Sequence, residues 1–247
     1  MRPFITAVRT LTILSVPGRD SDRLASALPF FPAIGVLIGA IVVLTLYAAS
    51  MSGWIAGAGV IAMIVAVWIT RGLHVDGLAD MIDALGASRA RERRLEIMKD
   101  PHMGAFGVMA IVADLLLKTV ALSHLAALSQ WSLTLVPFIV SRTIQVVLAT
   151  SLPYARLEGG KAAAFVQEAR PYHLLLALVA AVAFCLAASG LTGLLLLLEG
   201  LVIASVLRLW MKHHFGGVTG DLLGASNEII ETGLLVFAAF IATTGYG

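Results

Sequence analysis

The amino-acid sequence predicts an all-α integral membrane protein, a polytopic bundle of about seven transmembrane helices with cytoplasmic helical loops. Its 247 residues are 59% hydrophobic and only 13% charged, whereas soluble proteins average about 25% charged residues. Apolar runs of about 20 residues, long enough to cross a bilayer as a helix, recur along the chain. Basic residues gather in alternate connections between these runs. We expect one membrane-embedded domain over residues 1–247.

Seven segments are apolar enough to span the membrane. They are 31–50, 54–70, 106–128, 131–151, 172–189, 191–210 and 229–245. The third carries Asp114 and Lys118, which either neutralise each other or serve the function, and the fourth carries Arg142. Because charged side chains avoid lipid, we expect both segments to lie inside the bundle. Arg142 and Glu199 are either partners or members of a phosphate site.

The connections predict the orientation of the chain. If the spans alternate in direction, 1–30, 71–104, 152–171 and 208–228 lie on one side of the membrane. These connections hold 15 of the 17 Lys and Arg residues, the other two being Lys118 and Arg142, and the opposite connections hold none. The positive-inside rule therefore places the N-terminus and these four segments in the cytoplasm.

The first 28 residues predict an amphipathic helix at the membrane interface. Their apolar part is short and interrupted by polar residues, and no small-residue cleavage site follows, so a signal peptide is not expected. The single cysteine, Cys185, lies in an apolar run and supplies neither a disulfide framework nor a metal site. No basic run with interleaved aromatic residues indicates nucleic-acid binding. Membrane lipid is the expected partner.

An acidic stretch from His74 to Gly86 organises the chain, with three carboxylates in eight residues. On a helix, Asp76, Asp80 and Asp83 fall on one stripe. Three like charges this close repel one another unless a cation intervenes, so the stripe predicts a divalent metal site. The alternative is a solvated helix face at the membrane edge. An open flank for a large ligand is predicted by the small residues beside the stripe, Gly77, Ala79, Ala84 and Ala87.

Two more polar stretches lie on the same predicted side. The arginine-rich segment 88–100 predicts a second helix, which either touches anionic headgroups or grips a phosphorylated substrate. Asp100 stands at the turn that follows, where a fourth carboxylate can face the first three. In the segment 216–228 a glycine recurs every four residues, which predicts close helix packing. Asp221, beside these glycines, is predicted to be a site residue.

Four motifs, in this order along the chain, resemble the cobalamin synthase family, the adenosylcobinamide-GDP ribazoletransferases. They are R-G-L-H-V-D-G-L-A-D-M-I-D-A-L-G at 71–86, I-M-K-D-P-H-M-G-A-F-G-V at 97–108, L-L-L-K at 115–118 and G-G-V-T-G-D-L-L-G-A at 216–225. The resemblance covers nearly the whole chain, and the first two motifs are specific. The family's second motif more usually reads K-D-S-R-I-G-T-F-G. The differences, Pro101, His102, Met103 and Ala105, argue against a catalytic His102.

The resemblance implies a magnesium-dependent enzyme of the bacterial inner (cytoplasmic) membrane, with its N-terminus and active site in the cytoplasm. Such an enzyme joins adenosylcobinamide-GDP to α-ribazole, or to its 5′-phosphate. The products are adenosylcobalamin, or its 5′-phosphate, and GMP. A ribose hydroxyl attacks the phosphorus next to the cobinamide.

The expected chemistry assigns roles to the aspartates. Mg²⁺ prefers one or two carboxylates together with phosphate oxygens and water, so we predict that Asp76, Asp80 and Asp83 bind the metal. Asp100 or Asp221 then completes the metal shell or acts as the base. Catalysis would consist mainly of positioning and charge neutralisation.

Five other residues complete the predicted site. Lys99 or Lys118 is expected to help GMP leave, and Arg142 and Glu228 are expected to contact the substrate. His74 is a possible base only if the helix begins after it, since on a continuous helix it points away from the aspartate stripe.

Other functions remain open at this point. The membrane CDP-alcohol phosphotransferases share magnesium and diphosphate chemistry, but their full aspartate pattern is missing here. A membrane prenyltransferase would carry a second aspartate-rich cluster. A transporter would also keep charges inside the membrane, but transporter sites favour the midplane. Here the densest acidic group lies at the predicted cytoplasmic edge, and no inverted repeat is visible.

Overall fold

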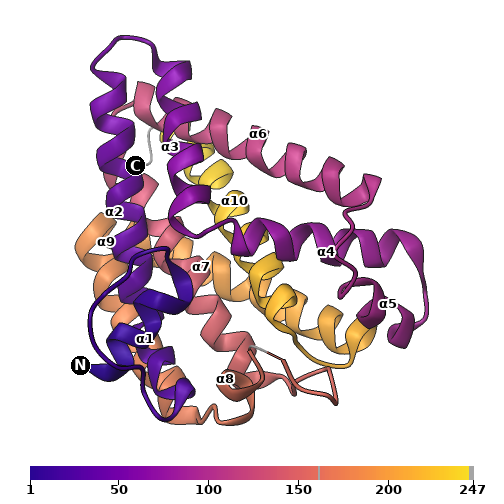
Figure 1. Ribbon diagram of the computed structural model, residues 1–247. Coiled ribbons are helices and arrows are strands. Elements are labelled where there is room, and N and C mark those ends of the chain that lie inside the picture. The colour runs from indigo at the N-terminus through magenta and orange to yellow at the C-terminus, as the bar shows by residue number, and fades with distance from the viewer. Residues whose placement is uncertain (161, 245–247) are drawn as a thin grey trace.

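The computed structural model describes residues 1–160 and 162–244 and folds into a bundle of helices (Figure 1). The elements are α1 (Arg2–Leu11), η1 (Leu24–Phe30, a 3₁₀ helix), α2 (Phe31–Ser50), α3 (Ile55–Ile69), α4 (Leu73–Ala87), α5 (Arg91–Ile97), α6 (Ala105–Ala127), α7 (Trp131–Ser151), α8 (Ala163–Gln167), α9 (Pro171–Phe215) and α10 (Gly220–Thr244). The described residues form no β-strand, only an isolated bridge between Tyr154 and Val218. A helix satisfies its own backbone hydrogen bonds, which lipid cannot do. The all-α membrane prediction is confirmed.

The predicted count of seven spans is not confirmed. Among the described residues, five helices are long and apolar enough to cross a membrane, or six if the bent pair α3 and α4 forms one span. The five are η1 with α2, α6, α7, α9 and α10. With 15 residues, α3 is too short to be counted alone. Residue 245, the end of the last predicted span, lies outside the described residues.

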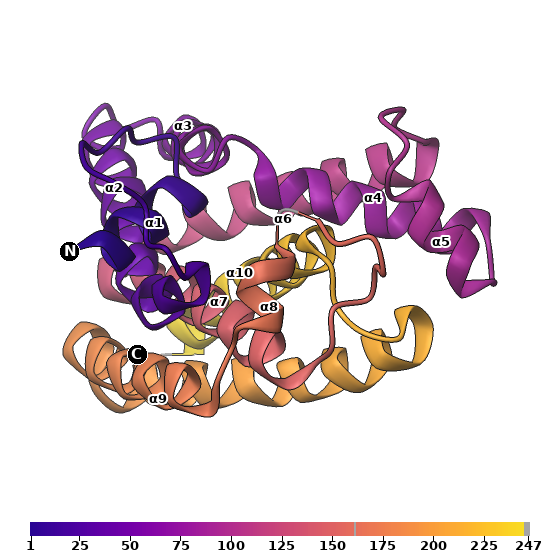
Figure 2. The same ribbon diagram turned by 60° about the horizontal axis from the view of Figure 1, so that its bottom comes forward.

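The 45-residue helix α9 covers two of the predicted spans. Ser189 and Gly190 leave the helical conformation where the sequence predicts one span to end and the next to begin. A Cβ atom on Gly193 would lie 2.1 Å from the carbonyl oxygen of Cys185. Residues this far apart in a continuous helix are about 12 Å apart along its axis. The chain therefore doubles back, and α9 has two arms (Figure 2).

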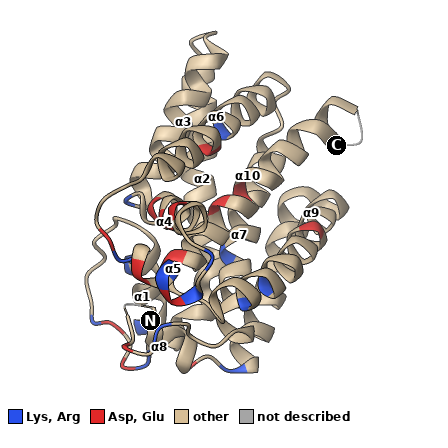
Figure 3. Ribbon diagram, turned by 90° about the vertical axis from the view of Figure 1, so that its right-hand side faces the viewer, with Lys and Arg blue, Asp and Glu red and all other residues tan. Residues whose placement is uncertain are grey.

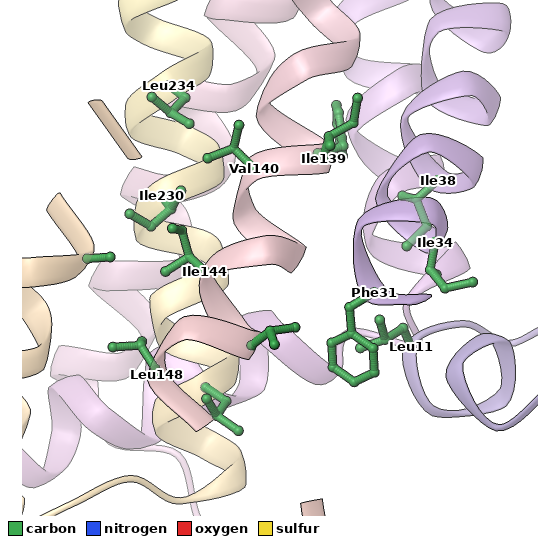
Figure 4. Close-up of a cluster of buried hydrophobic side chains, with 14 of the residues drawn as sticks. Leu11, Phe31, Ile34, Ile38, Ile139, Val140, Ile144, Leu148, Ile230 and Leu234 are labelled. Carbon is green, nitrogen blue, oxygen red and sulfur yellow. The ribbon is translucent and has the colours of Figure 1, made fainter. Parts of the chain in front are cut away.

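The core lies around α7, which packs against α2, α9 and α10. Figure 4 shows the buried apolar side chains that α7 places between α2 and α10: Ile139, Val140, Ile144 and Leu148 of α7, Phe31, Ile34 and Ile38 of α2, and Ile230 and Leu234 of α10. By contrast, only 28% of the most apolar stretch of α6 and 17% of that of α9 is buried. These two helices therefore present apolar side chains toward lipid, while α7 supports the interior.

The bend between α3 and α4 decides where the acidic stripe lies. The two helices meet at 87°. Arg71 and Gly72 between them have positive φ angles of 56° and 65°, and the amide of Gly72 donates to the carbonyl of Val67 at 2.9 Å. This left-handed turn is a common helix ending. As a result, α4 leaves the direction of α3 and packs between α10 and α6 (Figure 1).

The N-terminal helix α1 ends at Leu11, well before residue 28. Its buried apolar side chains include Ile5, Val8 and Leu11, and α1 packs against η1 and α2. The apolar face that the sequence predicts to enter the membrane interface is covered by the protein itself.

The small residues of α4 do not leave the open flank that the sequence predicts beside the aspartate stripe. A Cβ atom on Gly77 would lie 2.4 Å from the backbone oxygen of Asp221, and one on Gly107 of α6 would lie 3.1 Å from the Cβ of Ala79. The predicted open flank is therefore wrong, because α10 and α6 fill it. Small residues let helix backbones approach closely, and here they bring α10 to the aspartate stripe.

We expect Gly77→Ala to lower the stability of the folded protein, because its methyl group would meet the backbone of Asp221. Overpacking of this kind costs about 1–3 kcal/mol. Gly233→Ala is the matched control, since nothing lies within 4 Å of its added Cβ and alanine favours a helix. Thermal unfolding in detergent should show a lower midpoint for Gly77→Ala only. Equal midpoints for the two variants would contradict the close contact.

Candidate active site

The candidate active site lies where α4 crosses the start of α10. Asp76 and Asp80 project from α4, and Asp221 stands in the first turn of α10. The contact between Gly77 and the backbone of Asp221 joins the two helices at this point. Figure 3 shows the acidic residues along α4 and, separately, charged residues on α6 and α10. We call Asp76, Asp80 and Asp221 the edge carboxylates.

The edge carboxylates repel one another. Burial and the charges of Asp76 and Asp221 raise the pKa of Asp80 from 3.8 to about 7. No group of three or more His, Cys, Asp or Glu side chains among the described residues is arranged to hold a metal ion. Mg²⁺, however, takes only one or two protein carboxylates and fills the rest of its shell with phosphate oxygens and water. The donors and their crowded negative charge fit such an ion.

Arg156 joins the edge carboxylates and was missed in the sequence. Its Nη2 donates to Asp221 at 2.7 Å and to the carbonyl of Met98 at 3.3 Å. Its Nε is buried and has no hydrogen-bond partner among the described residues. A guanidinium with a spare donor suits a phosphate oxygen.

The position of Arg156 depends on two connections that lie far apart in the sequence. The amide of Ala155 donates to the carbonyl of Val218, and the amide of Val218 donates to that of Pro153, both at 2.9 Å. These bonds fix Arg156 beside Asp221. In the sequence Arg156 is one basic residue of a cytoplasmic segment, and no periodic pattern marks it.

Asp83, the third aspartate of the stripe, caps α6. Its two carboxylate oxygens accept hydrogen bonds from the amides of Gly104 at 2.7 Å and Gly107 at 2.8 Å. A carboxylate at a helix N-terminus is favourable, because it satisfies free amides and faces the positive end of the helix dipole. Asp83 therefore holds α6 against α4. Its predicted role as a metal ligand stays a prediction, since each oxygen keeps a further lone pair.

Asp100 forms its hydrogen bonds within its own turn. Its side chain is 55% exposed, and its Oδ1 accepts hydrogen bonds from the backbone and the ring of His102. These bonds lower the pKa of Asp100. Its expected place facing the other carboxylates, as a metal ligand or base, stays a prediction.

Lys99 lies at the edge of the site. Its ammonium group pairs with Glu158, and the two side chains are 43% and 75% exposed. Lys99 follows Met98, whose carbonyl accepts a hydrogen bond from Arg156, so the two cations are close in the fold. The ammonium group of Lys99 has three donors, and Glu158 competes with a substrate phosphate for them.

Four predicted site residues lie elsewhere, inside the bundle: Lys118, Arg142, Glu228 and His74. Lys118 of α6 contacts Glu228 and lies 2.9 Å from Glu231, both on α10, and 3.6 Å from Asp114. Arg142 of α7 pairs with Glu231, and not with Glu199 as the sequence allows. We call Asp114, Lys118, Arg142, Glu228 and Glu231 the buried charge network.

His74 borders this network and does not lie on the aspartate stripe. Its Nδ1 is 3.9 Å from Glu228, and its Nε2 is 3.1 Å from Nε2 of Gln145. α4 begins at Leu73, so His74 lies on the continuous helix and points away from the carboxylates. The proposed alternative, a helix that begins after His74, is wrong.

The network changes the interpretation of Lys118, Arg142 and Glu228. Each of these side chains is no more than 4% exposed, and each has a charged partner. A charge buried in a medium of low dielectric constant is tolerated only when it is paired. The network therefore ties α6, α7 and α10 together.

We expect Lys118→Met to destabilise the protein by about 3–5 kcal/mol, because it leaves buried carboxylates without their cation. Arg93→Gln is the control, since Arg93 forms an exposed pair with Glu96 at 3.0 Å that contributes about 0–1 kcal/mol. Thermal unfolding in detergent measures both. A Lys118→Met protein with unchanged stability and no activity would instead show a catalytic lysine.

Comparison with known proteins gives a consistent result. The family model described as cobalamin-5-phosphate synthase matches residues 3–239. A relative from Chlorobaculum tepidum named adenosylcobinamide-GDP ribazoletransferase is 44% identical over 238 residues, which cover 95% of this chain and 94% of the relative. A relative of the same name from Syntrophobacter fumaroxidans is 39% identical over 245 residues, which cover 96% and 97%.

No solved structure matches this chain. The sequence relatives nevertheless match nearly the whole length of the chain. This chain therefore belongs to the cobalamin-5-phosphate synthase family.

Proposed function

We propose that this protein is an adenosylcobinamide-GDP ribazoletransferase, as its relatives are named. It transfers the cobinamide-bearing phosphate group of adenosylcobinamide-GDP to α-ribazole or to α-ribazole 5′-phosphate. The products are adenosylcobalamin, or its 5′-phosphate, and GMP. The observation that supports this most directly is the meeting of the edge carboxylates with Arg156.

The reaction is a phosphoryl transfer. The ribose hydroxyl oxygen of α-ribazole forms a bond to the phosphorus next to the cobinamide, and the bond from this phosphorus to the bridging oxygen breaks. GMP leaves with the bridging oxygen, and the hydroxyl proton passes to a carboxylate of the site. Such transfers need mainly positioning and neutralisation of phosphate charge.

Mg²⁺ is the cofactor that we propose. Asp76 and Asp80 would hold it from α4, with Asp221 on the opposite side from α10. When bound, the ion would neutralise the diphosphate oxygens and the charge on the leaving GMP. Asp83 would act as a positioning residue through its hydrogen bonds to α6, with any contact to the ion secondary.

Arg156 would bind the diphosphate. Its Nη2 donates to Asp221, while its Nε has no hydrogen-bond partner in the part of the chain that the structure describes. A phosphate oxygen would satisfy that donor with a charge-assisted hydrogen bond. Lys99 would assist at the rim of the site.

We propose the bacterial inner membrane as the location, with the site in the cytoplasm. The four connections on the predicted cytoplasmic side hold 15 of the 17 Lys and Arg residues. Asp221 and Arg156 belong to two of these connections, and α4 and α5 to a third. Nucleotide-activated substrates are available on this side.

We expect Asp80→Asn to abolish adenosylcobalamin formation from adenosylcobinamide-GDP, α-ribazole and Mg²⁺ in lipid. The carboxylate that binds the ion is lost. The thermal stability without Mg²⁺ should stay the same or rise, because a repelling charge disappears from a crowded site. Asp22→Asn, at an exposed pair with Arg2, should keep its activity. Equal product from Asp80→Asn and the unmodified protein would overturn the metal assignment.

We expect Arg156→Gln to lower kcat/KM for adenosylcobinamide-GDP by about 100-fold, the usual effect of removing one donor to a charged transition state. KM for α-ribazole should change little. Arg208→Gln, an exposed site on α9, serves as the control. Steady-state assays with each substrate varied in turn would measure the effect. A loss confined to α-ribazole would place Arg156 at the other substrate.

A further inference from the structure

A cavity at the start of α9 lies outside the site described above. It has a volume of about 320 Å³, within the usual range of small-molecule sites. The side chains that matter in its lining are Arg23, Ser26, Glu168, Arg170, Tyr172 and His173. We call it the α9 pocket. The edge carboxylates and the buried charge network contribute no residue to it.

Two arginines give the α9 pocket its charge. The side chains of Arg23 and Arg170 are exposed, and neither has a carboxylate within ion-pair distance among the described residues. Ser26 holds the turn at Arg23, since its hydroxyl donates to the Arg23 carbonyl at 2.6 Å. Two guanidinium groups around one cavity favour a phosphate group.

His173 adds a third donor and is only 3% exposed. Its Nδ1 accepts the backbone amide of Arg170 at 3.0 Å. An Nδ1 that accepts carries no hydrogen, so in the neutral ring the hydrogen is on Nε2. This Nε2–H has no hydrogen-bond partner among residues 1–160 and 162–244. His173 lines the cavity, and a ligand oxygen there would satisfy this donor.

The α9 pocket lies at the start of two helices that can cross the membrane. Arg23 and Arg170 each immediately precede a helix that is long and apolar enough to cross a membrane, beginning at Leu24 and at Pro171. Both guanidinium groups therefore stand at headgroup level. Tyr172 is exposed beside them, as is typical of aromatic residues at this level. Leu175 and Leu176 are exposed one turn further along α9 and offer an apolar path for an acyl chain.

Glu168 is a carboxylate on the same cavity. Beside a phosphate alone it would repel the ligand, but beside a headgroup that also carries an ammonium group it would attract it. Phosphatidylethanolamine has both charges, whereas phosphatidylglycerol has only the phosphate.

We propose that the α9 pocket binds one glycerophospholipid of the ethanolamine type. Its phosphate lies between Arg23, Arg170 and the Nε2–H of His173, and its ammonium group lies at Glu168. A soluble phosphate ester shares the phosphate chemistry and is the competing source. The apolar path along α9 favours the lipid.

The test uses the full-length protein in detergent and native mass spectrometry. We titrate it with dioleoylphosphatidylethanolamine, with dioleoylphosphatidylglycerol and with inorganic phosphate. One ethanolamine lipid should be retained per protein in preference to the glycerol lipid, and millimolar phosphate should not displace it. Arg170→Gln should weaken retention about tenfold, since a charge-assisted hydrogen bond contributes about 1.5–3 kcal/mol.

Two variants separate the parts of the proposal. Arg19→Gln removes an exposed arginine of the same N-terminal segment that does not line the cavity, and it should retain lipid normally. Glu168→Gln should still bind lipid but lose its preference for ethanolamine. An unchanged preference would overturn the role of Glu168. Equal retention by Arg170→Gln and Arg19→Gln, or displacement of the lipid by phosphate, would overturn the lipid site.

Discussion

The crossing of α4 over the first turn of α10 is the contact on which the candidate site depends. Gly77 allows the backbone of Asp221 to approach α4 closely. Further along the same two helices, His74 of α4 and Glu228 of α10 meet inside the bundle. The edge carboxylates therefore rest on a junction between α4 and α10 that extends from Gly77 and Asp221 into the interior of the bundle. A shift of α10 along α4 would separate Asp221 from Asp80 and would also strain the buried charge network.

The two clusters of charges solve different physical problems. Inside the bundle, two cations, Lys118 and Arg142, face three carboxylates, Asp114, Glu228 and Glu231. Each charge has a partner there, because an unpaired charge in a low dielectric medium is costly. At the edge, Arg156 pairs with Asp221, and burial together with the remaining repulsion raises the pKa of Asp80. Every charge of the first cluster is paired within the protein, whereas the second keeps more carboxylates than the cation beside them can pair.

The sequence was sufficient for the fold class and for the stripe of Asp76, Asp80 and Asp83, because both follow from local patterns. Long apolar runs indicate membrane helices, and residues spaced three or four apart lie on one face of a helix. The role of Asp83 could not be read this way, since it depends on how the amides of Gly104 and Gly107 meet α4. Arg156 was missed for the same reason, because hydrogen bonds between two distant connections place it.

The residues inside the bundle show a different limit of a single sequence. Lys118, Arg142 and Glu228 attract attention in the sequence because charges are rare in membrane helices, and rarity suggests function. Three-dimensional pairing supplies another explanation, which a single sequence cannot reveal. Lys118 and Glu228 are far apart along the chain and adjacent in the fold.

The charge balance of the candidate site also determines how a diphosphate can enter it. Asp76, Asp80, Asp83 and Asp221 act together on a site where Arg156 is the neighbouring cation. A diphosphate would add negative charge to a surface that is already negative, and Coulomb repulsion at these distances is strong when water is partly excluded. A divalent ion between the carboxylates and the diphosphate would neutralise negative charge on both. The same carboxylates that hold the ion would therefore reject the substrate without it, so the protein would bind adenosylcobinamide-GDP as its metal complex.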